Sequence, residues 1–403
     1  MSTPVIATPS SLAMARSPLF ITGRNNALPN DTLNYMSLAL RIYSGVRTGT
    51  GTNNYSLSKN YSINEVINFE ISDLVRSEFY HDFSIWNDLG FTQSPQGEVL
   101  WVYPFGSVTY SDNGASPDTE EWGSSNEQTL VTDGWATMTN INPTSFSGLV
   151  MATSRDRQCL PSNYESLALY NSVANAFTEI EITWNNGDSD TFYTSVSSTT
   201  PPDPTSNNSR DLVVYAGVGP ANLENNAWID SSIKPSAHDT GDYYDVILKD
   251  SGGDVIDTVR YYMVCEPKYT PYQVAFINRY GVADFITFFK RSDERGNFTQ
   301  DTYQKSIYND GFTTPSLEVG KYNSFNVNSR NSLTLNTGFV DQDYDETIKD
   351  ILMSEYVAVL ENSQWIAVQP ERGSIEYQKH INQKLINYTL TFTYAFDERS
   401  LVR

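Results

Sequence analysis

The stretch of residues 180–192, IEITWNNGDSDTF, decides the fold class of this 403-residue chain. Apolar side chains at Ile180, Ile182 and Trp184 alternate with polar ones, which is the period of a strand with one buried face. An Asn-Gly pair separates this run from a second short one. Because both central residues of a type I′ turn take positive φ, Asn-Gly between two such runs is a strong hairpin signal. The stretch therefore predicts a β-hairpin.

The same organisation recurs further along the chain. Residues 243–248 and 255–264 are apolar-rich runs on either side of the turn sequence DSGGD. Residues 387–394 alternate over their whole length. The 26 Tyr, 19 Phe and 7 Trp residues, with plentiful polar turn residues, are typical of sheets. We therefore predict a mainly β protein with β-sandwich-like domains and few short helices.

The length of 403 residues predicts two or three domains, because single hydrophobic cores stop growing near about 250–300 residues. Prolines and small residues over 1–18 indicate an extended N-terminal arm. A β domain is expected over 19–139, and a β-sandwich domain over 140–266. The last domain, 267–403, is expected to be β with one amphipathic helix.

That helix is predicted over residues 343–356, where apolar side chains recur with a 3.6-residue period at Tyr344, Ile348, Ile351, Leu352 and Tyr356. A second, short helix is predicted to begin at Ser72-Asp73, with one of these two residues as its N-cap. The polar stretches 111–128 and 197–209 are expected to be exposed loops.

The charge balance excludes one class of partner. The chain has 48 acidic and 26 basic residues, a formal net charge of −22. A surface this negative repels phosphate backbones, and the sequence has no local basic patch. We therefore expect no direct nucleic-acid binding.

Targeting signals and cysteines set two further expectations. The first residues have neither a basic region nor an uninterrupted apolar run, and no long apolar stretch follows. We expect no secretory signal and no membrane span, with synthesis and assembly in the cytoplasm. Cys159 and Cys265 are too few for a disulfide framework, although a single bond between them stays open.

No catalytic motif is present. The three histidines, His81, His238 and His380, lie far apart and outside any known catalytic pattern. His81, beside Asp82, is expected at a turn or on the surface. Paired carboxylates of a glycoside hydrolase come from distant strands, so that alternative stays open without a supporting motif. We predict no enzyme, no catalytic residue and no cofactor.

Two groups of acids resemble calcium-binding loops. Asp341, Asp343 and Asp345 have EF-hand spacing, but Glu346 stands where glycine is needed and Leu352 where a bidentate Glu is needed. We interpret them as acids at a helix start. The second group precedes a strand and is expected to be solvated: Asp239, Asp242 and Asp245. No metal site is predicted.

Neighbouring tyrosines in the strands allow two interpretations. Tyr243-Tyr244 and Tyr261-Tyr262 are suited to a carbohydrate-binding platform. Alternate aromatic residues more often pack in a core while their neighbours form surface or subunit contacts. We expect packing and interfaces.

Four stretches, quoted with their positions, carry a resemblance to a known class of proteins. Together they resemble virion structural proteins of tailed bacteriophages from marine and Bacteroidetes-type hosts, including crAss-like phages. The stretches are YSLSK (55–59) with VINFEISDLVR (66–76); YTPY (269–272) with FINRYG (276–281) and FFKRS (288–292); LTLNTGFV (333–340); and KLINYTLTFTYAF (384–396).

The resemblance implies a structural component of the virion, in its neck, tail or baseplate. It implies other virion proteins as partners and a homo-oligomer such as a ring, the usual product of head-to-tail interfaces that close. It implies no catalytic or binding residue. An alternative is a receptor- or glycan-binding module on the particle surface.

Overall fold

The computed structural model divides the chain into two compact units. Unit 1 comprises Met1–Glu266 and Phe276–Ile286, and unit 2 comprises Pro267–Ala275 and Thr287–Arg403. The structure describes residues 5–7, 12–24, 31–46, 54–60, 66–112, 118–122, 128–136, 145–146, 148–192, 201–264, 268–306, 320–373 and 386–398.

Unit 1 begins with a sandwich of two sheets whose facing sides are apolar. The buried side chains of Ile21 and Phe69 in one sheet belong to the same core as those of Leu38 and Val102 in the other. The smaller sheet is antiparallel, with the order β1 (Val5–Ala7), β3 (Phe20–Arg24), β6 (Val66–Glu70). The larger has the order β11 (Ser145–Phe146), β2 (Leu12–Met14), β10 (Thr129–Thr132), β8 (Val99–Asp112), β4 (Asp31–Tyr43), β5 (Tyr55–Asn60), with β9 (Asp118–Trp122) also paired to β8.

A second sandwich follows in unit 1. Its core contains the largest buried aromatic residues of the unit, among them Trp184, Tyr244 and Tyr261. One sheet has the order β12 (Asp156–Cys159), β18 (Val255–Met263), β17 (Tyr243–Lys249), β14 (Glu179–Trp184), β15 (Ser189–Thr191). The other has the order β13 (Ser166–Tyr170), β16 (Val213–Gly217), β7 (Phe91–Gln93).

Strand pairing crosses the division expected between residues 139 and 140. Strand β7, from the first expected domain, completes a sheet of the second sandwich, and β11, from the second, pairs with β2. Residues 12–15, inside the segment expected to be an arm, are buried, because β2 lies between β10 and β11. Residues 1–4 and 8–11 lie outside the described residues.

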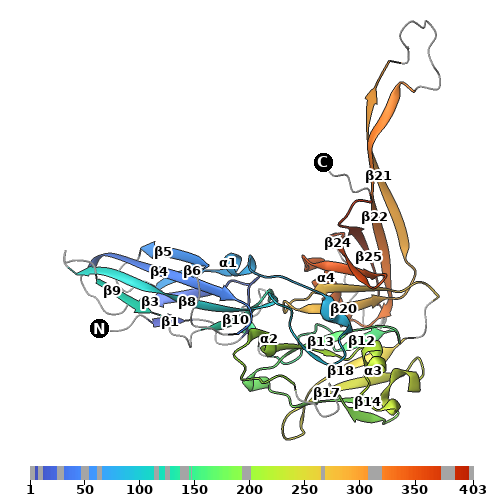
Figure 1. Ribbon diagram of the computed structural model, residues 1–403, viewed down its shortest axis with the longest axis horizontal. Coiled ribbons are helices and arrows are strands. Elements are labelled where there is room, and N and C mark those ends of the chain that lie inside the picture. Colours follow the sequence, from blue (N-terminus) through green and yellow to red (C-terminus); the bar gives the residue numbers. More distant parts are fainter. Residues whose placement is uncertain are drawn as a thin grey trace. The chain divides into compact units, whose positions relative to one another are not determined.

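Unit 2 is built on one large sheet (Figure 1). The buried side chains of Leu333, Leu335, Leu390 and Phe392 alternate with polar ones along its central strands, so one face is apolar and the other polar. The order is β20 (Ala283–Phe288), β19 (Tyr272–Ile277), β23 (Val357–Glu361), β24 (Gln364–Pro370), β25 (Ile386–Tyr394), β22 (Tyr322–Val340), β21 (Asp293–Gln304). Most of β20 and the end of β19 fall within Phe276–Ile286, which the division assigns to unit 1.

The last two strands of this sheet continue as a two-stranded ribbon, drawn in orange in Figure 1. Strand β22 pairs with β25 only from Ser332 onward, whereas its pairing with β21 extends out to Tyr322 opposite Gln304. A bulge interrupts the ribbon, with Asn326 at a φ of +52°. Asparagine tolerates this left-handed conformation better than most residues.

The helices are few and short, as predicted. The amphipathic helix α4 (Tyr344–Met353) is confirmed, and it ends before residue 356 because Ser354 is already extended. Helix α1 (Ser72–Arg76) is capped by Ile71 without a side-chain bond, so the predicted Ser or Asp cap is wrong. The others are α2 (Ser209–Leu212), α3 (Pro220–Asn225), η1 (Ser84–Asn87), η2 (Val173–Asn175), η3 (Ser231–Ile233) and η4 (Pro235–Ala237).

Two local predictions need correction. The β14–β15 hairpin forms, but only Gly187 has a positive φ, at +97°; the turn is therefore a type I turn with a glycine bulge and not type I′. The polar stretch 111–128 is not all loop, because β8 continues to Asp112 and pairs with β9.

The prediction of a mainly β, multi-domain protein with β-sandwich-like parts is confirmed. Within the described residues, no helix is long and apolar enough to cross a bilayer.

Candidate functional site

A buried group of charged side chains in unit 1 is centred on Arg157. Its guanidinium pairs with Glu165 and, at 2.6 Å, with Asp284, and all three side chains are at most 8% exposed. Burial raises the pKa of Glu165 to about 7. Asn278 donates to the other oxygen of Asp284 at 3.2 Å and to the carbonyl of Met151 at 2.6 Å. The group neutralises charges that burial alone would make costly.

A second buried acid lies in the same unit. One oxygen of the Glu98 carboxyl group, Oε1, accepts hydrogen bonds from the Tyr215 hydroxyl at 2.6 Å and from the backbone N–H of Ala283 at 3.1 Å. Glu98 is fully buried, and this burial raises its pKa to about 8. Its second oxygen, Oε2, has no hydrogen-bond partner among the described residues.

These two groups explain why Phe276–Ile286 belongs to unit 1 although unit 2 segments flank it in the sequence. Residues Asn278, Ala283 and Asp284 of this segment are bonded to side chains and backbone from far earlier in the chain. The acids are enclosed and cannot contact a substrate in this conformation. Their geometry indicates that they anchor the segment Phe276–Ile286 to the rest of unit 1.

His81 and His238 have different neighbours. His81, expected at a turn or on the surface, has a fully buried side chain, and that expectation is wrong. Its Nε2 lies 3.1 Å from the carboxylate of Asp133, which Arg16 also binds through two bonds of 2.6 and 2.9 Å. Although burial opposes it, these bonds lower the pKa of Asp133. His238 stacks on Trp184, 3.7 Å between ring centroids, and His380 lies outside the described residues.

The candidate calcium ligands also have other partners. Asp245 binds Arg260 through two oxygens at 2.7 and 2.8 Å, while Asp242 accepts from Asn185 at 2.9 Å. In the EF-hand-like string, Asp345 is buried and accepts from the Tyr388 hydroxyl. Its place in the first turn of α4 confirms the interpretation as helix-start acids. The described part of the chain holds no cluster of three or more metal-ligating side chains.

The paired tyrosines pack as expected. Tyr244 and Tyr261 are fully buried and stacked with an interplanar angle of 3°. Their neighbours Tyr243 and Tyr262 lie on the opposite side of the sheet, and Arg260 covers the Tyr243 ring at 4.1 Å. Cys159 is buried and free, and Cys265 lies outside the described residues.

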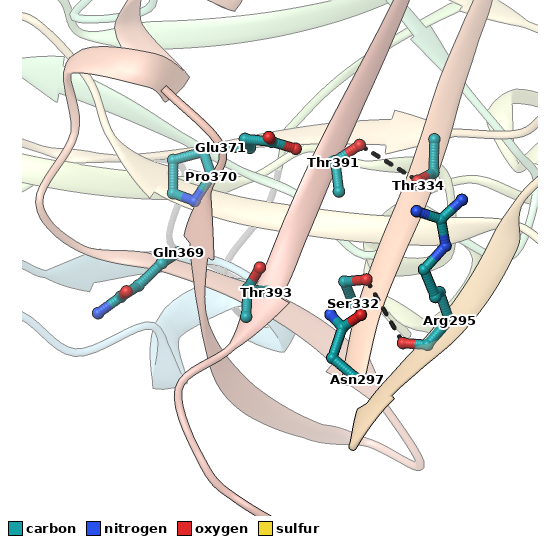
Figure 2. A pocket seen from close by; sticks show the side chains of 9 residues that line it. All are labelled: Arg295, Asn297, Ser332, Thr334, Gln369, Pro370, Glu371, Thr391 and Thr393. Carbon is teal, nitrogen blue, oxygen red and sulfur yellow. Dashed lines mark hydrogen bonds between the residues drawn. The ribbon is translucent and has the colours of Figure 1, made fainter. Parts of the chain in front are cut away.

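A polar groove of about 510 Å³ lies on the solvent face of the unit 2 sheet (Figure 2). Strand pairing aligns its lining, because residues opposite each other in antiparallel strands share a face. Ser332 stands opposite both Arg295 and Thr393, and Thr393 opposite Gln369. The lining residues are Arg295, Asn297, Ser332, Thr334, Gln369, Pro370, Glu371, Thr391 and Thr393.

The groove presents hydrogen-bonding groups of both kinds. Thr334 and Thr391 bond to each other at 3.2 Å, and Ser332 donates to the backbone of Arg295, as Figure 2 shows. The side chains of Arg295 and Glu371 form no ion pair with any described residue. The lining holds hydroxyls, amides, one cation and one anion but no aromatic ring, so it suits a hydroxyl-rich ligand better than a flat apolar one.

The second exposed feature of unit 2 is the outer part of the ribbon, residues 298–305 with 321–329, which we call the ribbon tip. Strand β21 is exposed at every position. Among described residues, four large aromatic side chains of the tip are 49–76% exposed: Phe298, Tyr303, Tyr322 and Phe325. Tyr303 and Phe325 contact each other edge to face at 5.7 Å.

The sequence did not single out either feature. The groove comes from four strands that are up to about a hundred residues apart in sequence, and only their pairing brings the lining together. The ribbon is exposed on both faces, so β21 lacks the alternation that identifies a half-buried strand. Its Tyr and Phe residues between polar ones were the available signal.

The comparisons with known proteins give little. No family model and no curated protein sequence matches the chain. Trypsin-activated alpha-2-macroglobulin of Escherichia coli aligns over 96% of this chain and 21% of its own, at 7% identity and a TM-score of 0.21. The native form of that protein aligns at 7% sequence identity and a TM-score of 0.22, over 96% of this chain and 20% of its own. Invasin, a bacterial integrin-binding protein, aligns at 8% sequence identity and a TM-score of 0.20, over 83% of this chain and 56% of its own. Likenesses at these TM-scores carry no argument about this chain.

Proposed function

We propose that this chain is a structural component of a bacteriophage virion, a neck, tail or baseplate element that acts through subunit assembly and not through catalysis. The observation that carries the proposal is the ribbon tip with its four exposed aromatic side chains. The resemblance of the four sequence stretches to virion structural proteins supplies the particle type.

The physical argument concerns the stability of the tip. A two-stranded ribbon without a packed face is marginal in water, and exposed aromatic residues add to the unfavourable hydration. Among the described residues, strand pairing of the tip beyond Ser329 is only between β21 and β22, and the Asn328 side chain donates to Asp397 at 3.1 Å. A contact that covers Tyr303 and Phe325 would stabilise it, and clustered exposed apolar side chains mark interaction sites in other proteins.

The buried charged and acidic groups support an anchoring role. Arg157 and Glu98 hold distant segments of unit 1 together and lie in its interior. His81 and His238, the two histidines in the described part of the chain, have Asp133 and the Ser232 carbonyl as hydrogen-bond partners and not a nucleophile.

The decisive experiment is the protein composition of particles. Phage particles that encode the chain are purified on a density gradient, washed in high salt and quantified by mass spectrometry. We expect the chain in a fixed, multi-copy ratio to the neck or tail proteins. A chain that is abundant in the lysate but removed from the washed particles would overturn the proposal.

A second candidate function is a glycan- or receptor-binding module, and the groove of Figure 2 is the observation that favours it. Its hydroxyl and amide lining suits a polyhydroxylated ligand. A glycan array with the purified chain tests it. Binding that is lost in Gln369→Ala but kept in Asn323→Ala, outside the groove, would move this function ahead. The absence of any signal would remove it.

A further inference from the structure

We propose that the groove of Figure 2 binds a short, linear, uncharged oligosaccharide that lies across the strands of the unit 2 sheet. The inference rests on the glycan-binding candidate above and names the size, the charge and the orientation of the ligand. It depends on how strand pairing arranges the lining residues, on the lengths of their side chains and on the charges at the two sides of the groove.

The lining residues form two rows that run across the strands. The members of the first row, one on each of β21, β22, β25 and β24, are Arg295, Ser332, Thr393 and Gln369. In the second row, Thr334 stands opposite Thr391, whose carbonyl accepts a hydrogen bond from the Glu371 N–H at 2.7 Å. Each row therefore begins or ends at a charged or amide side chain and has hydroxyls in its middle.

Side-chain length turns these rows into a basin with a floor and two walls. The floor consists only of Ser and Thr from β22 and β25, and Ser332 is 7% exposed. The walls are the longer, exposed side chains of Arg295 on β21 and of Gln369 and Glu371 at β24. Since β21 and β24 are three strand spacings of about 4.8 Å apart, the walls stand about 14 Å apart and leave room for roughly two or three linked sugar rings.

The hydrogen-bonding groups of the basin match a ligand with adjacent hydroxyls. Each floor hydroxyl both donates and accepts, whereas an Arg side chain only donates and an ionised Glu only accepts. The guanidinium fork of Arg295 donates to two neighbouring oxygens at once, and the two oxygens of Glu371 accept from two neighbouring hydroxyls. A pair of vicinal hydroxyls therefore satisfies either wall, so each end of an oligosaccharide finds a partner.

The charges of the basin favour an uncharged ligand. Arg295 and Glu371 contribute one charge of each sign, and neither forms an ion pair with a described residue. An acidic group on the ligand would be attracted by Arg295 but repelled by Glu371 and by the chain's net charge of −22. An extended peptide also fits less well, because Pro370 is the one apolar residue of the lining and peptide recognition needs pockets for side chains.

The test measures affinity against ligand length. The full purified chain is screened on an array of linear neutral and acidic glycans, from single sugars to tetrasaccharides. The strongest neutral binder is then titrated calorimetrically as a series of increasing length. We expect the Kd to fall about tenfold or more from the single sugar to the trisaccharide, because the second wall adds hydrogen bonds to a charged group. It should change little for the tetrasaccharide, and it should be the same at low and high salt.

Two variants test the walls. Arg295→Gln and Glu371→Gln each remove a charged hydrogen-bonding group at an exposed position, so each should raise the trisaccharide Kd about tenfold. Lys268→Gln and Glu355→Gln remove the same charges at exposed positions outside the basin and are the matched controls, with an unchanged Kd. Equal unfolding midpoints of all four variants verify that the sheet is intact.

The outcomes separate this inference from the proposed functions. Binding of acidic glycans alone, equal affinity for single sugars and trisaccharides, or unchanged affinity in both wall variants would overturn the inference and leave a glycan-binding function standing. The absence of binding to any glycan removes both the inference and the glycan-binding candidate. None of these results changes the protein composition of purified particles, which decides the virion function by itself.

Discussion

Replacing Glu98 by Gln should make unit 1 more stable at neutral pH. The folded protein keeps the Glu98 pKa near 8, whereas the unfolded chain has the ordinary value of 4.5. Between these values the folded state retains a proton that the unfolded state releases, so the free energy of unfolding falls as pH rises. Each pH unit between the two pKa values lowers the free energy of unfolding by at most about 1.36 kcal/mol. Because the unfolded group is not fully ionised at pH 5, the total decrease from pH 5 to pH 7 is about 2.5 kcal/mol. Gln keeps the acceptor for Tyr215 and cannot ionise.

The assay is thermal unfolding followed by tryptophan fluorescence. Six of the seven tryptophans lie in unit 1, so the signal reports this unit. The midpoint difference between Glu98→Gln and wild type should grow by roughly 5–10 °C from pH 5 to pH 7. Glu70→Gln, at an exposed position, is the control and should show no such growth. A Glu98→Gln difference that stays constant over this range would refute the reasoning about burial.

Two further predictions concern packing and buried charge. Arg16→Met removes the two hydrogen bonds of Arg16 to the Asp133 carboxylate, which is 4% exposed, and should lower the free energy of unfolding by about 3 kcal/mol in a urea titration. Arg291→Met breaks the exposed ion pair with Asp293 and should lower it by less than about 1 kcal/mol in the same assay. Phe392→Ala opens a cavity in the unit 2 core and should lower the free energy of unfolding by about 3–5 kcal/mol. The fluorescence of the single tryptophan of that unit reports the transition. Phe396→Ala, at a side chain that is 66% exposed, should leave the unfolding midpoint almost unchanged. Equal effects of the buried and exposed changes would contradict both assignments of burial.

Local pattern predicted the hairpins well. The strands β14, β17, β18 and β25 appear where alternation and turn residues placed them, because each signal lies within a few residues of the strand it defines. Turn type was less predictable. The type I′ geometry expected at Asn186-Gly187 occurs instead at Asn362-Ser363, both with positive φ, in the β23–β24 hairpin. A hairpin tolerates several loop geometries, so the Asn-Gly pair indicates the turn but not its φ angles.

The long-range arrangement was not readable from the sequence. His81 was expected at a turn or on the surface because it is beside Asp82, yet its buried ring lies within hydrogen-bond distance of Asp133, 52 residues away. The Arg157 group likewise joins residues 127 positions apart. The residues next to such a partner in the sequence do not identify it, because a charged residue has the same local sequence whether it is exposed to solvent or buried beside an opposite charge.

Strand β2 has a consequence for the time course of folding. Arg16, just after this strand, meets Asp133 only after 117 further residues exist, and β2 itself needs β10 and β11 as neighbours. At a ribosomal rate of about 5–20 residues per second, 117 residues take about 6–23 s. Throughout this interval the apolar run Leu12–Ala15 is synthesised but has no strand to pair with. Proteins whose contacts join distant residues also fold slowly once the whole chain is present. We expect this short run to be the first place where a chaperone engages the nascent chain.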